Sequence, residues 1–347
     1  MVDAGLARWG RTAGGLALGA AGGALFAALG LPLPWLLGAM LTVTAATLAG
    51  LQLEIAPPLR LAMLVVLGVL IGSAFDRAML QEMARWSWSL AALPLYVLVI
   101  AGGMMAYLRG IAGFDRVTAY FAAAPGGLSE MILMSDRGGA DVRRVSLVHA
   151  LRLVLLVTAI PFIVDHLGLL APAPPPLASP SAVDVLVLAA AGVVGLALAR
   201  LVRLPSAVLL GPLLASAVVH VVGWSDSRPP DVAVAFAQVV IGAAVGARFT
   251  GFGPAAVLRT LGHGVVTTAM MLVLAAGFAL VVHPLAGVAL LPLLIAYVPG
   301  GVAEMALVAL ALGIDPAFVA VHHAVRIVLV VGLASVLFER VVPASER

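Results

Sequence analysis

Six ionisable side chains lie in stretches of this sequence that are otherwise apolar: Glu130, His149, Arg152, Glu304, His323 and Arg326. Each histidine precedes an arginine by three residues, a spacing that places both side chains on one face of a helix. An ionised carboxylate in apolar surroundings is costly unless it is paired, so we expect the acids to meet these basic groups. Such a set could bind a small solute or a coupling ion, and the histidines could relay protons.

A structural explanation is open beside the functional one. The planar arginine fork suits a carboxylate of the protein as well as one of a substrate, so Glu130–Arg152 and Glu304–Arg326 could be buried ion pairs. The histidines could be hydrogen-bonded packing residues. His322, which has no counterpart in the first half of the chain, is the weaker candidate.

Each acid follows a proline–glycine–glycine motif, which is Pro125-Gly126-Gly127 in the first half and Pro299-Gly300-Gly301 in the second. Proline lacks a backbone N–H and glycine has a low helix propensity, so a helix is predicted to break at each motif. These six residues join the six ionisable ones in the predicted substrate- and ion-binding site. No metal site, catalytic residue or cofactor is predicted.

The two motifs belong to an internal duplication. PGGLSEM and PGGVAEM begin at residues 125 and 299, and the same offset of 174 pairs Asp141 with Asp315, Gly68 with Gly242 and Gly72 with Gly246. The aspartates are predicted helix caps, and the glycines are predicted positions of close helix packing. Prolines between the copies indicate a linker. The predicted organisation is a first membrane repeat over 1–168, a Pro-rich linker over 169–183 and a second membrane repeat over 184–347.

The composition is that of a chain solvated by lipid. Of 347 residues, 63% are apolar and 10% are charged, and residues 12–53 and 260–303 carry no charged side chain. Each of these runs is long enough for two spanning helices, since about 20 apolar residues cross a bilayer. The balance excludes a soluble enzyme and a nucleic-acid-binding protein. It leaves membrane lipid as a partner, and homo-oligomerisation is an open possibility.

Each copy divides into six apolar segments, predicted to be helices because lipid forces backbone groups to pair within a segment. Positive residues collect on the cytoplasmic side of a membrane. If the broken fifth segment of each copy enters and returns on one side, fourteen of seventeen loop arginines lie inside; if all six segments cross, there is no bias. The prediction is an all-α polytopic protein of the inner (plasma) membrane, with two inverted repeats, about ten transmembrane helices, two broken or re-entrant elements and cytoplasmic N- and C-termini.

The paired sequences APGGLSEM and VPGGVAEM, followed by GADVRRVSLVHALR and GIDPAFVAVHHAVR, resemble the duplicated AbrB-type integral membrane protein family. The resemblance extends from about residue 12 to residue 338. Members of the family are labelled as ammonia monooxygenases or as AbrB family transcriptional regulators. The resemblance implies an inner-membrane protein distantly similar to cation/proton antiporters and anion transporters with inverted repeats, and it supplies no substrate.

Two functions follow from these observations. The first is a secondary transporter of a small organic solute, coupled to protons or sodium, with alternating access between inverted repeats. The alternative is a membrane regulatory or sensor protein that affects gene expression indirectly. Monooxygenase activity is disfavoured because no ligand spacing for copper or zinc occurs, and the lack of lysine excludes a phosphate-binding GxxxxGK[ST] loop. The chain is therefore predicted not to be an enzyme.

Overall fold

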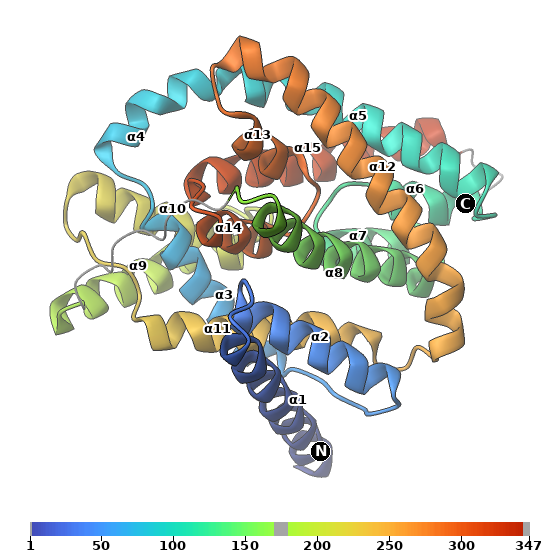
Figure 1. Ribbon diagram of the computed structural model, residues 1–347, viewed down its shortest axis with the longest axis horizontal. Helices are drawn as coiled ribbons and strands as arrows, with labels where there is room; N and C mark the ends of the chain where they lie inside the picture. Colours follow the sequence, from blue (N-terminus) through green and yellow to red (C-terminus); the bar gives the residue numbers. More distant parts are fainter. Residues whose placement is uncertain (1, 170–179, 343–347) are drawn as a thin grey trace. The chain divides into compact units, whose positions relative to one another are not determined.

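The computed structural model describes residues 2–169 and 180–342, and all regular secondary structure in these ranges is helical. Figure 1 shows the elements in chain order, which are α1 (Val2–Ala28), α2 (Pro34–Leu48), α3 (Pro57–Gly72), α4 (Arg77–Glu82), the 3-10 helix η1 (Met83–Trp86), α5 (Ser87–Gly110), α6 (Arg116–Ala123), α7 (Leu128–Arg137), α8 (Val142–His166), α9 (Ala182–Leu201), α10 (Ala207–Val222), α11 (Asp231–Gly246), the 3-10 helix η2 (Ala247–Phe249), α12 (Pro254–Ala286), α13 (Leu290–Tyr297), α14 (Val302–Ala311) and α15 (Pro316–Val341).

Within the described residues, six helical segments are long and apolar enough to cross a membrane: Met83–Gly110, Val142–His166, Ala182–Leu201, Asp231–Phe249, Pro254–Ala286 and Pro316–Ala334. Four further apolar helices, α2, α3, α10 and α14, have between 10 and 17 residues. At a rise of about 1.5 Å per residue these are shorter than the roughly 30 Å hydrocarbon layer. The all-helical membrane class is confirmed, whereas the count of about ten crossings stays a prediction.

Most of the predicted linker lies outside the described residues, which stop at 169 and resume at 180. The described chain after it enters α9 at Ala182. Ser181 starts this helix with a capping box: its hydroxyl accepts the backbone N–H of Asp184, and the Asp184 carboxylate accepts the backbone N–H of Ser181.

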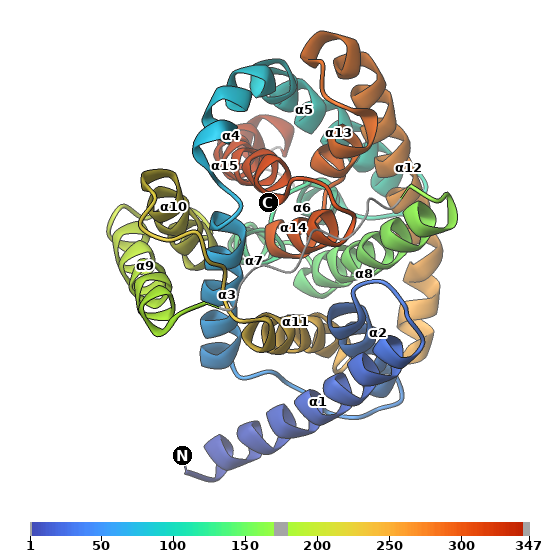
Figure 2. The same ribbon diagram turned by 60° about the vertical axis from the view of Figure 1, so that its left-hand side comes forward.

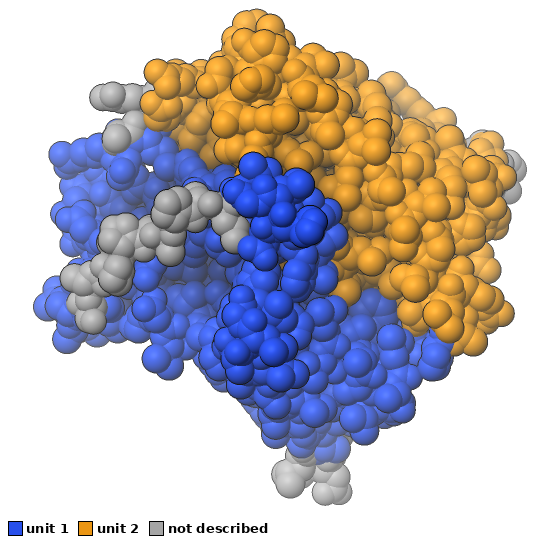
Figure 3. Space-filling model, in the orientation of Figure 1, with its two compact units in different colours: residues 1–81, 158–254, 306–317 blue, residues 82–157, 255–305, 318–347 orange. Residues whose placement is uncertain are grey.

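The described chain forms two compact units, coloured separately in Figure 3. Unit 1 contains residues 1–81, 158–254 and 306–317, and unit 2 contains residues 82–157, 255–305 and 318–347. Each unit therefore combines segments of both sequence repeats. The repeats of the sequence do not coincide with the compact units, because helices of one copy pack against helices of the other.

In unit 1, glycines allow helices of one copy to pack closely against helices of the other. A Cβ on Gly68 or Gly72 of α3 would collide with the Leu209 or Leu213 carbonyl of α10, respectively. The second copy repeats these contacts, with Gly242 and Gly246 of α11 against the carbonyls of Leu36 and Met40 in α2. Figure 1 and Figure 2 show α10 beside α9 and α3, and α2 beside α1 and α11. The glycines predicted to mark close packing do so across the two copies.

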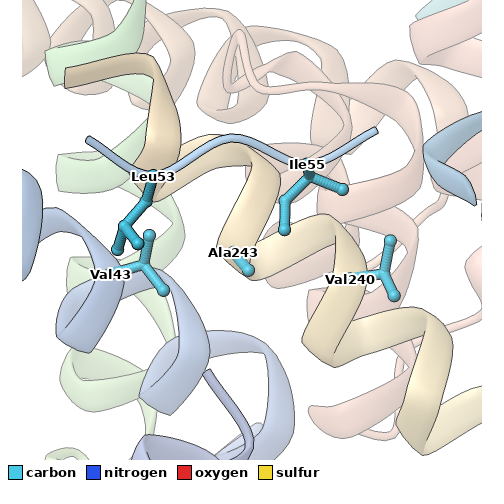
Figure 4. Close-up of a cluster of buried hydrophobic side chains, with 5 residues drawn as sticks. All are labelled: Val43, Leu53, Ile55, Val240 and Ala243. Atoms are coloured by element: carbon cyan, nitrogen blue, oxygen red, sulfur yellow. The ribbon is translucent and has the colours of Figure 1, made fainter. Parts of the chain in front are cut away.

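An apolar cluster lies where α2 packs against α11. Val43 of α2 and Val240 and Ala243 of α11 are covered by Leu53 and Ile55, which belong to the extended segment between α2 and α3 (Figure 4). The same segment carries Glu54, whose carboxylate pairs with Arg8 at 3.3 Å and Arg11 at 2.9 Å. These pairs connect α1, which begins at Val2, to the segment after α2.

Gly72→Ala is expected to destabilise the protein, because the new methyl group would overlap the Leu213 carbonyl and lie 2.6 Å from the Ser216 Cβ. Overpacking of this kind typically costs about 1–3 kcal/mol. The control is Gly277→Ala in α12, where a Cβ meets no atom within 4 Å and the better helix propensity of alanine is the main effect. The thermal unfolding midpoint should fall for Gly72→Ala and not for Gly277→Ala. Equal midpoints would contradict the tight crossing.

Candidate functional site

The helix breaks occur at the two predicted motifs. α6 ends at Ala123 and α13 ends at Tyr297, and each is followed by a residue with extended backbone, Ala124 (φ −61°, ψ 128°) or Val298 (φ −56°, ψ 126°). The following proline disfavours the helical conformation in the residue before it for steric reasons. α7 then starts at Leu128 and α14 at Val302, so the predicted breaks are confirmed.

The glycines of the motifs make room for side chains of the next helical turn. A Cβ on Gly127 would collide with the Glu130 carboxylate, and one on Gly301 would collide with the Glu304 carboxylate. A Cβ on Gly126 would lie 3.1 Å from the Met131 Cε, and Gly300 faces Met305 in the same way. Each acid therefore folds back over the start of its own helix, and a larger residue at either glycine would have to displace the flexible Glu or Met side chain beside it.

A buried arginine from the following long helix holds each break. The terminal nitrogens of Arg152 in α8 donate to the carbonyls of Ala124 at 3.3 Å and Gly126 at 3.4 Å. Arg326 in α15 donates to the carbonyls of Val298 at 3.1 Å and Gly300 at 2.7 Å. These arginines are 5% and 1% exposed, respectively. All of the paired positions differ by 174, so the same arrangement occurs twice. We call each arginine with its two carbonyl partners a latch.

The arginines thus differ from the expected ion pairs. In the described part of the chain their hydrogen bonds go to carbonyl oxygens of the breaks and to His323, and not to Glu130 or Glu304. The physical reason is that the breaks leave backbone carbonyls without helical partners, and buried carbonyls need donors. An arginine fork satisfies two of them at once.

Opposite ends of each break receive opposite charges. The carbonyl ends of α6 and α13, which are the negative ends of the helix dipoles, face Arg152 and Arg326. The positive N-terminal ends of α7 and α14 carry Glu130 and Glu304 in their first turns. Both acids are only partly buried, in contrast to the arginines. The acids are therefore the more accessible charged groups of the site.

The histidines of the two long helices have different hydrogen-bond partners. His323 donates from Nε2 to the Ile295 carbonyl at 3.2 Å, which leaves Nδ1 to accept from Arg326 at 3.3 Å. His149 bonds through Nδ1 to the Val145 carbonyl at 3.0 Å and is 1% exposed. His322, given less weight in the sequence, packs its Nε2 2.8 Å from the Ser89 Oγ of α5. In the second copy, the histidine and the arginine that share a helix face, His323 and Arg326, are joined by a direct hydrogen bond.

Tyrosines beside the breaks were missed by the sequence reasoning. Tyr297 donates to the Ser89 carbonyl at 2.8 Å, and Tyr120 donates to the Ala334 carbonyl at 2.8 Å. Tyr96 is fully buried against Tyr297, and its hydroxyl has no hydrogen-bond partner in the described structure. Tyrosine is rare in this chain, which has four. A tyrosine hydroxyl within an otherwise apolar run was the sequence feature that could have marked these positions.

The aspartates predicted as caps are confirmed in that role. The Asp141 carboxylate accepts the backbone N–H of Arg144 at 3.1 Å, and the Asp315 carboxylate accepts that of Ala317 at 2.8 Å. Among residues 2–169 and 180–342, no group of three or more histidine and acidic side chains is arranged to hold a metal ion.

A family model described as "Transition state regulatory protein AbrB" matches residues 35–342. The chain belongs to the AbrB family. Two relatives are similar to this chain over most of their length. "Uncharacterized protein YhjN" of Bacillus subtilis (strain 168) is 28% identical over 352 residues, covering 92% of this chain and 90% of the relative. "Putative regulator AbrB" of Escherichia coli (strain K12) is 27% identical over 312 residues, covering 87% and 88%. No solved structure matches.

Arg326→Lys tests the latch, because a lysine keeps the charge but cannot hold two carbonyls in a planar fork. Losing hydrogen bonds to a charged group should lower stability by about 1.5–3 kcal/mol. The matched control is Arg340→Lys on the same helix, where the arginine is exposed. We expect a lower unfolding midpoint and faster amide exchange over residues 302–305 for Arg326→Lys alone. Identical exchange in both variants would show that the latch does not hold α14.

Proposed function

We propose that this AbrB-family protein is a secondary transporter of a small organic solute, coupled to protons or sodium, in which two inverted repeats provide alternating access. The observation that carries the proposal is the repeated latch: each half supplies a broken helix whose carbonyls are held by a buried arginine. Broken helices in duplicated halves are typical of secondary transporters, where free helix ends bind solutes and ions.

The proposed site consists of the two motifs and the acids that follow them. Glu130 and Glu304 are partly buried at the starts of α7 and α14, so they can exchange a proton or a cation while remaining close to free backbone groups. His149 and His323 belong to the site as neighbours of the arginines. We place no enzymatic step in this arrangement.

A regulatory or sensor role is the second candidate, because the family description and one relative's name both refer to regulation. A sensor would bind its ligand at the same breaks without moving it across the membrane. Effects on gene expression would then be indirect. Binding and flux measured on one preparation separate the two functions.

Glu130→Gln and Glu304→Gln should each abolish most of the transport. Counterflow in proteoliposomes, with a panel of radiolabelled small organic solutes under a proton or sodium gradient, first identifies a transported solute. Uptake of that solute should fall about tenfold or more in either variant, a change equal to about 1.4 kcal/mol. Glu82→Gln, at an exposed acid paired with Arg85, is the control. Full uptake by both site variants would remove the acids from the mechanism, and binding without flux of any solute would favour the sensor.

In the proposed topology, the protein lies in the inner membrane and both of its termini lie in the cytoplasm. The chain has no natural cysteine, so single cysteines can be introduced without background labelling. Cysteines replacing Arg137 and Arg203 should react only with reagents on the cytoplasmic side, whereas one replacing Arg85 should react from outside. Labelling of position 137 or 203 from outside would overturn the inverted arrangement.

A further inference from the structure

Several parts of unit 1 meet around a pocket near the start of α3. They are α1, the extended segment between α2 and α3, α3 itself, and the end of α11 with η2. The pocket has a volume of about 480 Å³, within the range of about 300–1,000 Å³ that small-molecule sites occupy. Its charged lining consists of Arg11, Glu54, Arg60 and Arg248, and we call it the basic pocket.

Positive charge is in excess around the basic pocket. Glu54 supplies the one carboxylate of the lining, and this carboxylate already pairs with two arginines, Arg8 at 3.3 Å and Arg11 at 2.9 Å. The Arg60 side chain has no hydrogen bond or ion pair with another described residue. Three guanidinium groups and one carboxylate leave two positive charges, which select an anion. Arg248 also lines the pocket, but it has an interaction of its own, so this balance is made without it.

Two arginines of the lining are suited to a phosphate group. A guanidinium has five N–H donors, and the hydrogen bond from Arg11 to Glu54 uses its Nη2. This bond also holds Arg11 at the pocket, which reduces the entropy that a ligand must cost. A phosphate monoester carries a charge of about −1.5 to −2 at pH 7, which matches the excess of two positive charges. Its tetrahedral oxygens can accept from arginines of two different helices, α1 and α3.

The other sequence copy shows that the fold does not require these arginines. The offset of 174 relates α3 to α11 and places Val234 at the position that corresponds to Arg60. The same offset places Ala74 at the position that corresponds to Arg248. Arginines that only orient a protein in the membrane need to lie beyond the lipid, and they need not line one cavity. Their presence around a single pocket therefore indicates a use beyond folding and orientation.

We propose that the basic pocket binds the phosphate monoester group of an anionic ligand. The phosphate lies at Arg11 and Arg60, and the carbon atoms attached to it lie against the apolar part of the lining, which includes Leu53, Ile55 and Ala244. A soluble organic phosphate and the headgroup of phosphatidate both offer this chemistry. The pocket belongs to unit 1, whereas both latches and both acids belong to unit 2, so the inference does not rest on the proposed transport.

Calorimetric titration of the purified full chain in a neutral detergent tests the soluble form, with glycerol 3-phosphate as the probe. This probe should bind about tenfold or more tightly than glycerol and than malonate, a dianion whose acceptor groups are planar carboxylates. Binding should weaken as salt is added, because the charges of the pocket are partly exposed. Equal affinity for malonate would overturn the assignment to phosphate, and equal affinity at low and high salt would overturn its electrostatic basis.

Arg60→Val, which introduces the residue of the other copy, should weaken the binding of glycerol 3-phosphate about tenfold or more. Arg60→Lys should have an intermediate affinity, because lysine keeps the charge without the planar fork, and it carries the same comparison if the valine variant does not fold. The matched control is Arg200→Val, which changes the net charge equally at an exposed arginine of unit 1 outside the lining.

Thermal unfolding midpoints near that of the unaltered protein verify that the variants fold. Undiminished binding of glycerol 3-phosphate by both folded Arg60 variants would refute the site. An equal loss of binding in Arg200→Val would also refute it, because a general effect of net charge would then explain the result.

Nanodiscs identify the source of the phosphate. Glycerol 3-phosphate is titrated into the protein in phosphatidylcholine nanodiscs with and without phosphatidate. If phosphatidate alone prevents its binding, the ligand is a lipid headgroup; if binding is the same in both, the ligand is a soluble phosphate. A folded protein that does not bind glycerol 3-phosphate, and whose unfolding midpoint phosphatidate does not raise, has no such site. Solute flux in that protein would leave the proposed function intact, whereas phosphate binding without any flux would defeat the function and keep the site.

Discussion

Backbone carbonyls that lose their helical partners in an apolar environment are the constraint on which unit 2 depends. Proline and glycine interrupt two helices, and each interruption exposes polar groups that must be satisfied inside the protein because lipid offers no donors. Arg152 and Arg326 provide these donors from the adjoining long helices. One arrangement therefore links these residues. The arginines satisfy the carbonyls that the motifs expose, and the glycines leave room for the acids.

The two units solve different physical problems with the same duplicated sequence. In unit 1, glycines bring helices so close that backbone meets backbone, and this packing leaves little room for change. In unit 2, helices are interrupted and charges are buried. The site therefore lies where the chain accepts irregular backbone, while regular, tightly packed helices occupy the other unit.

The sequence predicted the features that depend on local chemistry. The breaks could be located at Pro125 and Pro299 because the loss of a donor and the steric effect of proline are properties of the residue itself. The partners of Arg152 and Arg326 could not be predicted, since a backbone carbonyl leaves no mark in a sequence and a nearby glutamate is the more obvious choice. The packing of α3 and α11 against helices of the other copy could not be predicted either. Small residues indicate close packing, but they do not identify the neighbouring helix.

The exchange has a consequence for biosynthesis. Gly68 and Gly72 of α3 are complementary to α10, whose residues are translated more than a hundred positions later. Until α10 emerges from the ribosome, the glycine face of α3 has no native neighbour, so the first copy cannot complete its tertiary structure as it is inserted. Assembly is thus postponed until most of the chain has been made, and a ribosome that stalls between the copies would leave a fragment exposed to membrane quality-control proteases.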